Sequence, residues 1–125
     1  MMMASQPSAP AQRLPERASQ RRLLVGAEAA FRNALVESIE GLELCDRNLI
    51  GFHYFHGLTV DQLAEMFSCP RGAVARQLAR IRERLLRDTR RGVAARLELD
   101  KPELDRLLDV ARSRFDLAIT RVLRS

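Results

Sequence analysis

The sequence predicts an all-α fold, a small helical domain with a helix-turn-helix motif followed by a C-terminal amphipathic helix. Three observations predict it. Apolar residues recur at spacings of three and four over most of the chain, as they do on one face of an α-helix. Gly57 and Pro70 separate such segments at positions where these residues end helices. With 125 residues and a mass of 14.2 kDa, the chain suffices for one domain with a single helical core.

The N-terminal segment, residues 1–19, has little to bury. It contains Pro7, Pro10 and Pro15 and, after the initial methionines, almost no apolar side chains. This composition predicts a disordered tail or an interdomain linker. No apolar run follows a basic start, as in a secretory signal, and no segment approaches the roughly 20 apolar residues of a membrane span. We therefore expect a cytoplasmic protein with no membrane partner.

A first helix is expected over residues 20–39. Its apolar positions recur at spacings of three and four, so that one face stays apolar along its length. These positions are Leu23, Leu24, Ala27, Ala30, Phe31, Ala34, Leu35 and Ile39. Gly41 follows and ends the helix.

A second helix is expected from about Asp46, which is placed to cap it, to about His56, with Gly57 as its C-terminal stop. Its aromatic residues have two interpretations. The first is that they belong to the core. The second is that Phe52 or Phe55 lines a groove for a helix of a partner protein.

The next two helices form the helix-turn-helix motif. Thr59 is a good N-cap, because its hydroxyl can accept a hydrogen bond from a free N–H group of the first turn. The first motif helix ends at Ser68 to Pro70, since proline cannot continue it. A longer helix follows, with Gly92 as its expected end. Its buried stripe is Val74, Leu78, Ile81 and Leu85.

The positive charge of the chain is concentrated on this longer helix. Residues 71–91 contain eight arginines and two acids, a net charge of +6, whereas the whole chain carries +5. Such a concentration is what phosphate binding requires, because neutralised phosphates release counterions. The chain contains 20 arginines and one lysine, so a solvated face in an arginine-biased sequence is the alternative.

The first half of the second motif helix usually reaches base edges. Arginine can pair bidentately with guanine, and glutamine with adenine. Spacings of three and four predict that Arg76, Arg80, Arg84 and Arg87 form one ridge. The candidate DNA-binding residues are Arg71, Arg76, Gln77, Arg80 and Arg84.

At these residues the chain resembles region 4 of the sigma-70 superfamily, and the extracytoplasmic-function sigma factors are the most similar type. The resemblance runs from about Phe31 to Arg91, half of the chain. The tail from Leu107 to Leu117 resembles the extension of a sigma-like family from myxobacteria. The matching residues are Gly57-Leu58-Thr59, Leu63-Ala64-Glu65, Gly72-Ala73-Val74, Leu78-Ala79-Arg80-Ile81-Arg82 and Leu85, with Leu42 to Ile50 as the start of the region.

The resemblance implies that the second motif helix enters the major groove of the upstream promoter hexamer, the minus-thirty-five element. It also implies that an apolar groove holds the flap-tip helix of the RNA polymerase β subunit. Family position favours Arg76, Gln77 and Arg80 for bases. Arg82, Arg84 and Arg87 are then phosphate contacts or surface charges. Arg47 contacts a phosphate in the family interpretation and is otherwise a solvated or ion-paired arginine.

Two departures from the family pattern are visible. Ala75 stands where members usually carry Lys or Arg, and Arg76 can replace that contact. Region 2, which binds the β′ subunit and melts the promoter, has no counterpart in these residues. We therefore expect either a fragment of a longer factor or a stand-alone region 4 protein that does not open DNA. The expected division is a tail or linker over 1–19, a region 4-like domain over 20–92 and a helical extension over 93–125.

The extension is expected to form one long helix to near the C-terminus, with Pro102 at its first position. Its apolar stripe either packs on the core of the domain or binds a partner such as an anti-sigma protein, a second copy or polymerase. The stripe consists of Leu104, Leu107, Leu108, Ala111, Phe115, Ala118, Ile119 and Val122.

No catalytic or cofactor-binding pattern stands out, and we expect neither an enzyme nor a bound cofactor. Cys45, His53, His56 and Cys69 could be considered as zinc ligands, but their spacing matches no common site. Two reduced thiols are the plainer interpretation.

The sequence therefore favours a promoter-recognition domain whose partners are double-stranded promoter DNA, the RNA polymerase core through its β flap, and an anti-sigma factor. One alternative is an interaction module that docks on polymerase or an anti-sigma factor and barely touches DNA. Another is a helix-turn-helix repressor that dimerises through its C-terminal helix.

Overall fold

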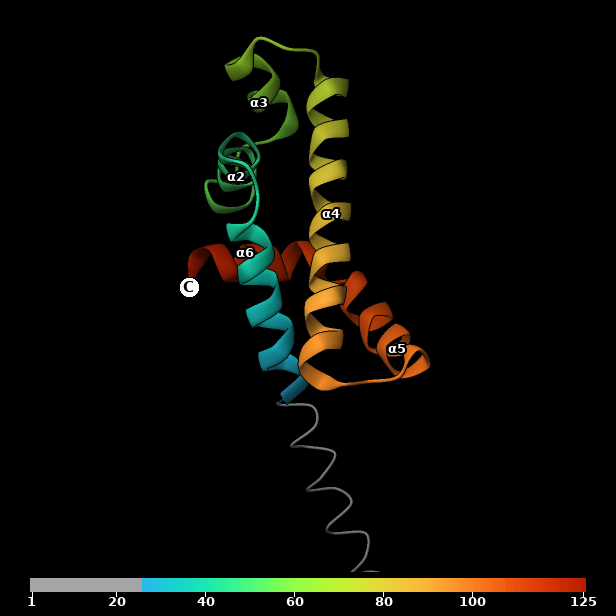
Figure 1. Ribbon diagram of the computed structural model, residues 1–125. Helices are drawn as coiled ribbons and strands as arrows, with labels where there is room; N and C mark the ends of the chain where they lie inside the picture. Colours follow the sequence, from blue (N-terminus) through green and yellow to red (C-terminus); the bar gives the residue numbers. More distant parts are fainter. Residues whose placement is uncertain (1–25) are drawn as a thin grey trace, which may run out of the picture.

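The computed structural model describes residues 26–125, which fold as helices joined by short connections (Figure 1). The predicted all-α class is confirmed, and the described residues contain no strand. The tail expected over residues 1–19 and the start of the first helix, residues 20–25, lie outside the described part. No helix among the described residues is both long enough and apolar enough to cross a membrane.

The first helix extends to residue 40 and stops before Gly41, as predicted. The second begins as α2 (Leu44–Ile50) and continues as the π-helical turn η1 (Gly51–Phe55). Gly57 follows with φ of +73°, a conformation that suits glycine and ends the helix.

The predicted cap at Asp46 is wrong. The N-cap of α2 is Glu43, whose side chain makes no capping hydrogen bond, and Asp46 lies within the first turn. Its carboxylate accepts a hydrogen bond from Gln77 on a distant helix instead. The Asp46 side chain therefore makes a tertiary hydrogen bond and does not cap its own helix.

The first motif helix is α3 (Val60–Phe67), and its predicted start is confirmed. Thr59 Oγ1 accepts from the Gln62 backbone N–H at 3.1 Å, and Gln62 Oε1 accepts from the Thr59 N–H at 2.8 Å. This capping box satisfies two backbone donors. Ser68 ends α3 in the left-handed conformation, with φ of 53°.

The second motif helix is α4 (Arg71–Leu97), which runs through the stop predicted at Gly92. A Cβ placed on Gly92 would lie 2.8 Å from the Cβ of Ala34 in the first helix. Glycine at this position therefore lets the two helices approach closely. The next residue, Val93, is fully buried, so packing outweighs the low helix propensity of glycine.

The C-terminal extension is two helices, not the single one predicted. They are α5 (Lys101–Arg112) and α6 (Phe115–Arg124), and Figure 1 shows α6 running across the direction of α4. Asp100 caps α5, and Pro102 occupies its second position. The break at residues 113–114 lets one apolar stripe reach two separate clusters.

These clusters show where the extension packs. In the smaller one, Leu104 and Leu108 of α5 lie with Ala34 and Val93. In the larger one, residues of α6 complete the core beneath the helix-turn-helix. The larger cluster contains Leu35, Ile39, Leu42, Leu49, Ile50, Tyr54, Leu63, Val74, Leu78, Ile81, Leu85, Leu86, Phe115 and Ile119. The stripe of the extension therefore packs largely on the chain itself.

Candidate nucleic-acid interface

The buried side of α4 determines which side faces solvent. The predicted stripe of Val74, Leu78, Ile81 and Leu85 is buried throughout, at 4% exposure or less. Each residue advances about 100° around the helix axis, so the residues roughly opposite this stripe point outward. They include Arg76, Arg80 and Arg87, which are all exposed and which we call the outer face.

Two residues of the outer face lie one turn apart near the N-terminal end of α4. Within residues 26–125, neither Arg76 nor Arg80 forms an ion pair. The Arg76 guanidinium folds back over Gly72, where a Cβ would lie 3.2 Å from its Nη1 atom. Both cations are therefore open to an external anion.

Gln77 lies at the edge of the outer face and bridges two elements. Its Nε2 donates to Asp46 Oδ1 of α2 at 2.9 Å, and its Oε1 accepts from Arg80 Nη1 at 3.2 Å. Asp46 and Gln77 are both half-buried. The sequence predicted Asp46 only as a helix N-cap, and no local pattern indicated that its side chain would contact Gln77.

Arg71, at the start of α4, pairs with Asp61 of α3 at 2.5 Å between Nε and Oδ1. Both side chains are more than 70% exposed, so solvent screens the pair and a phosphate could compete for the guanidinium.

Arg84 and Arg47 both turn to the connection between the first helix and α2. Arg84 Nη2 lies 3.4 Å from the Gly41 carbonyl oxygen, and its Nε lies 3.7 Å from an Asp88 carboxylate oxygen. Arg47 Nη2 donates to the Leu42 carbonyl at 3.2 Å. The predicted ridge is therefore wrong at Arg84, which is half-buried and lies about 80° around the axis from Arg76.

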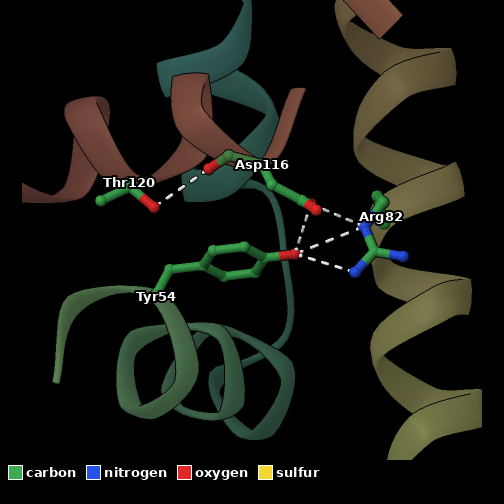
Figure 2. Close-up of polar contacts among 4 residues, drawn as sticks. All are labelled: Tyr54, Arg82, Asp116 and Thr120. Atoms are coloured by element: carbon green, nitrogen blue, oxygen red, sulfur yellow. Dashed lines mark hydrogen bonds and ion pairs between the residues drawn. The ribbon is translucent and has the colours of Figure 1, made fainter. Parts of the chain in front are cut away.

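Arg82, expected at a phosphate or at the surface, instead joins three helical elements (Figure 2). Its Nε donates to Asp116 Oδ1 of α6 at 2.8 Å, and its Nη2 donates to the Tyr54 hydroxyl of η1 at 3.1 Å. Tyr54 OH donates to the same carboxylate oxygen at 2.8 Å. Asp116 is also tied to its own helix, because Thr120 Oγ1 donates to its carbonyl at 3.0 Å.

Burial and charge shift the pKa values within this network. Burial raises the pKa of Tyr54, and its bond to Asp116 adds to this, although the bond from Arg82 opposes it. Burial alone would lower the pKa of Arg82, but its contacts with Tyr54 and Asp116 outweigh this and raise it. At neutral pH Arg82 therefore remains charged and committed to an internal contact.

The proposed partner-binding aromatics lie in different surroundings. Phe52 is half-buried against the core, whereas Phe55 is 43% exposed. The ring centroids of Phe52 and Phe67 are 6.1 Å apart, so α3 contributes to the same surface. Met66 and Phe67, which the sequence did not single out as partner contacts, are each 48% exposed.

The possible zinc ligands are not gathered. Among the described residues, no three His, Cys, Asp or Glu side chains lie where they could hold a metal ion. Cys45 is exposed and Cys69 half-buried, and both are free thiols. His53 Nδ1 lies 2.7 Å from the Leu58 carbonyl oxygen, a contact that its N–H can make as a donor.

Comparison with known proteins identifies the motif. Residues 32–85 match the family model described as sigma-70, region 4. No curated protein and no solved structure matched the chain. The family is not one of enzymes; its helix-turn-helix binds DNA in transcription initiation, and in sigma factors it binds the minus-thirty-five promoter element. The match covers the first helix from residue 32, α2, η1, α3 and α4 as far as Leu85, so the helix-turn-helix lies within it.

Proposed function

We propose that the chain acts in the cytoplasm, recognises the minus-thirty-five promoter element through the outer face of α4, and contacts RNA polymerase. One observation carries the proposal. Arg76 and Arg80 form no ion pair within residues 26–125, whereas several arginines further along α4 pair with acids. Those pairs are Arg82–Asp116, Arg84–Asp88, Arg90–Asp105 and Arg96–Glu37. Arg87 and Arg91 are also exposed and unpaired within these residues, but Arg76 and Arg80 are the open cations in the half of α4 where such motifs read bases.

The proposal gives each candidate a role. Arg76 and Arg80 face base edges in the major groove, and Gln77 lies beside Arg80 and contacts it. Arg71 exchanges Asp61 for a phosphate, and Arg47, exposed on α2, contacts the backbone nearby. Arg84 contributes a phosphate contact only if it leaves the Gly41 carbonyl, so we expect it to contribute least.

Arg80→Ala tests the proposal. We expect about tenfold weaker binding to a cognate promoter fragment, since a bidentate arginine–guanine pair is worth about 1–3 kcal/mol. The measurement is fluorescence anisotropy with labelled duplex over a series of salt concentrations. The matched control is Arg90→Ala, which removes the same charge from the same helix at a position paired with Asp105. Equal binding by Arg80→Ala and the unchanged chain at matched salt would refute the proposal.

The exposed aromatic surface supports polymerase docking as a second activity. Phe55, Met66 and Phe67 are each more than 40% exposed, and the rings of Phe52 and Phe67 lie side by side with their centroids 6.1 Å apart. We propose that this surface binds an apolar helix of the polymerase β flap, with an anti-sigma factor as a competing partner. Phe55→Ser should reduce capture of the isolated β flap while leaving DNA affinity unchanged. Arg80→Ala should do the reverse.

The alternative function, a repressor that dimerises through its C-terminal helix, is less well supported than promoter recognition. Its dimer needed the apolar face of the C-terminal helix, but Phe115 and Ile119 are buried inside the same chain. We retain the proposed division into a region 4-like domain over 20–92 and an extension over 93–125. The likeness of Leu107 to Leu117 to the myxobacterial extension supports the finer family placement.

A further inference from the structure

A carboxylate lies beside the proposed reading residues, where it should weaken DNA binding. Asp46 is half-buried on the first turn of α2 and accepts from Gln77 at 2.9 Å. A negative charge this close to an approaching phosphate backbone opposes association. A role of Asp46 that favours DNA recognition would offset this repulsion.

The contacts of Gln77 indicate that role. Its amide nitrogen donates to Asp46, and its amide oxygen accepts from Arg80 at 3.2 Å. The reversed amide would set its oxygen against the carboxylate and its NH₂ group against the guanidinium, so both contacts would be unfavourable. Asp46 thus selects one orientation of Gln77, and that orientation holds Arg80.

We propose that Asp46 is a positioning residue that sets the base preference of α4 by holding Arg80 through Gln77. This inference rests on the proposed promoter recognition. Gln77 is engaged at both polar ends of its amide, and so is not free to offer an unengaged amide to adenine. Arg80 keeps its remaining guanidinium donors for a base edge, and a fixed guanidinium favours the two acceptors of guanine. The chain should therefore prefer guanine at the base pair that Arg80 faces.

The experiment compares sequence discrimination with general affinity. The preferred duplex is selected from a randomised pool with the full 125-residue chain, and Arg80→Ala identifies the base pair that this residue reads. Fluorescence anisotropy then gives the affinities for the selected duplex, for its guanine-to-adenine variant and for a duplex of unrelated sequence. The ratio of the first two affinities is the discrimination.

Asp46→Asn should lower this discrimination about fivefold to tenfold, because an amide at position 46 can accept from or donate to Gln77 and no longer selects the orientation that holds Arg80. Its affinity for the unrelated duplex should not fall, since the change removes a negative charge. A merely structural defect would lower both. Gln77→Met, which keeps the length of the side chain but removes both polar contacts, should reproduce the loss of discrimination.

Asp61→Asn is the matched control. It removes another acid beside the N-terminal end of α4, but Asp61 pairs with Arg71 and does not touch Gln77. Its discrimination should equal that of the unchanged chain. In an Arg80→Ala background, Asp46→Asn should cause no further loss, because the residue it positions is gone.

The outcomes separate the two proposals. A selective chain whose discrimination survives both Asp46→Asn and Gln77→Met overturns the inference and leaves promoter recognition standing. Equal loss with Asp61→Asn also overturns it, because charge removal alone would then explain the effect. A chain that selects no sequence from the pool overturns both.

Discussion

The two parts of α4 carry the same kind of side chain in different surroundings. In the N-terminal part, residues 71–80, Arg76 and Arg80 lie open on the outer face. In the C-terminal part, residues 82–97, acids of other elements reach several of the arginines: Asp116 reaches Arg82, Asp105 reaches Arg90 and Glu37 reaches Arg96. Part of the charge of this helix therefore belongs to a candidate binding surface, and part is used in contacts with the extension and the first helix.

This difference teaches that a count of arginines along a helix does not locate a DNA-binding surface. The net +6 of residues 71–91 includes Arg82, whose charge is held between Tyr54 and Asp116. What matters is the charge that remains open after the helices have packed. Whether the charge of an arginine remains open depends on the side chains that pack beside it.

The largest expected effect comes from removing the anchor of α6. Phe115→Ala should lower the free energy of unfolding by about 3 kcal/mol, because the ring is buried in the main core. Below its melting temperature the variant should still bind DNA like the unchanged chain, since α6 does not touch residues 71–80 through any described polar contact. Chemical denaturation gives the first quantity and anisotropy the second. Weakened binding by the folded variant would show that the two parts of α4 are not independent.

A smaller effect is expected from Arg82→Ala compared with Arg76→Ala. Losing Arg82 should cost about 1 kcal/mol of stability, since its bonds to Tyr54 and Asp116 are partly screened by solvent. Losing Arg76 should leave stability almost unchanged and weaken DNA binding severalfold. Denaturation and binding curves of both variants test this reversal, and a similar result for the two arginines would remove the distinction between the parts of α4.

The smallest effect is a dependence on alkaline pH. Because the pKa of Tyr54 is raised in the folded protein, its contribution to stability is complete below the unfolded value of about 10 and is lost as the pH rises through the folded pKa. Unfolding free energies measured from about pH 9 to pH 11 should fall less steeply for Tyr54→Phe than for the unchanged chain. Parallel curves for the two proteins would exclude a contribution of this hydroxyl.

The helices could be predicted from the sequence because their causes are local. The capping box of Thr59 and Gln62 spans three residues, and the buried stripe from Val74 to Leu85 follows from helical spacing. The helix end predicted at Gly92 is wrong because its cause is not local. Glycine commonly ends a helix, but here it makes room for Ala34, more than 50 residues earlier in the chain.

The candidate site could be predicted only in outline. The positions of Arg76 and Arg80 on the outer face follow from the periodicity of α4. The diversion of Arg84 to the Gly41 carbonyl does not, because that carbonyl belongs to another element. The bond between Asp46 and Gln77 likewise joins residues 31 positions apart.

The sequence alone determined that the chain is helical, where its helix-turn-helix lies, which side of α4 is buried, and that basic charge gathers on that helix. Periodicity and capping act over a few residues, so the sequence displays them directly. Tertiary structure decided which arginines stay open, where the apolar stripe of the extension breaks, and which acid holds Gln77. These outcomes depend on side chains from distant segments meeting in space, and only the packing of the helices brings them together.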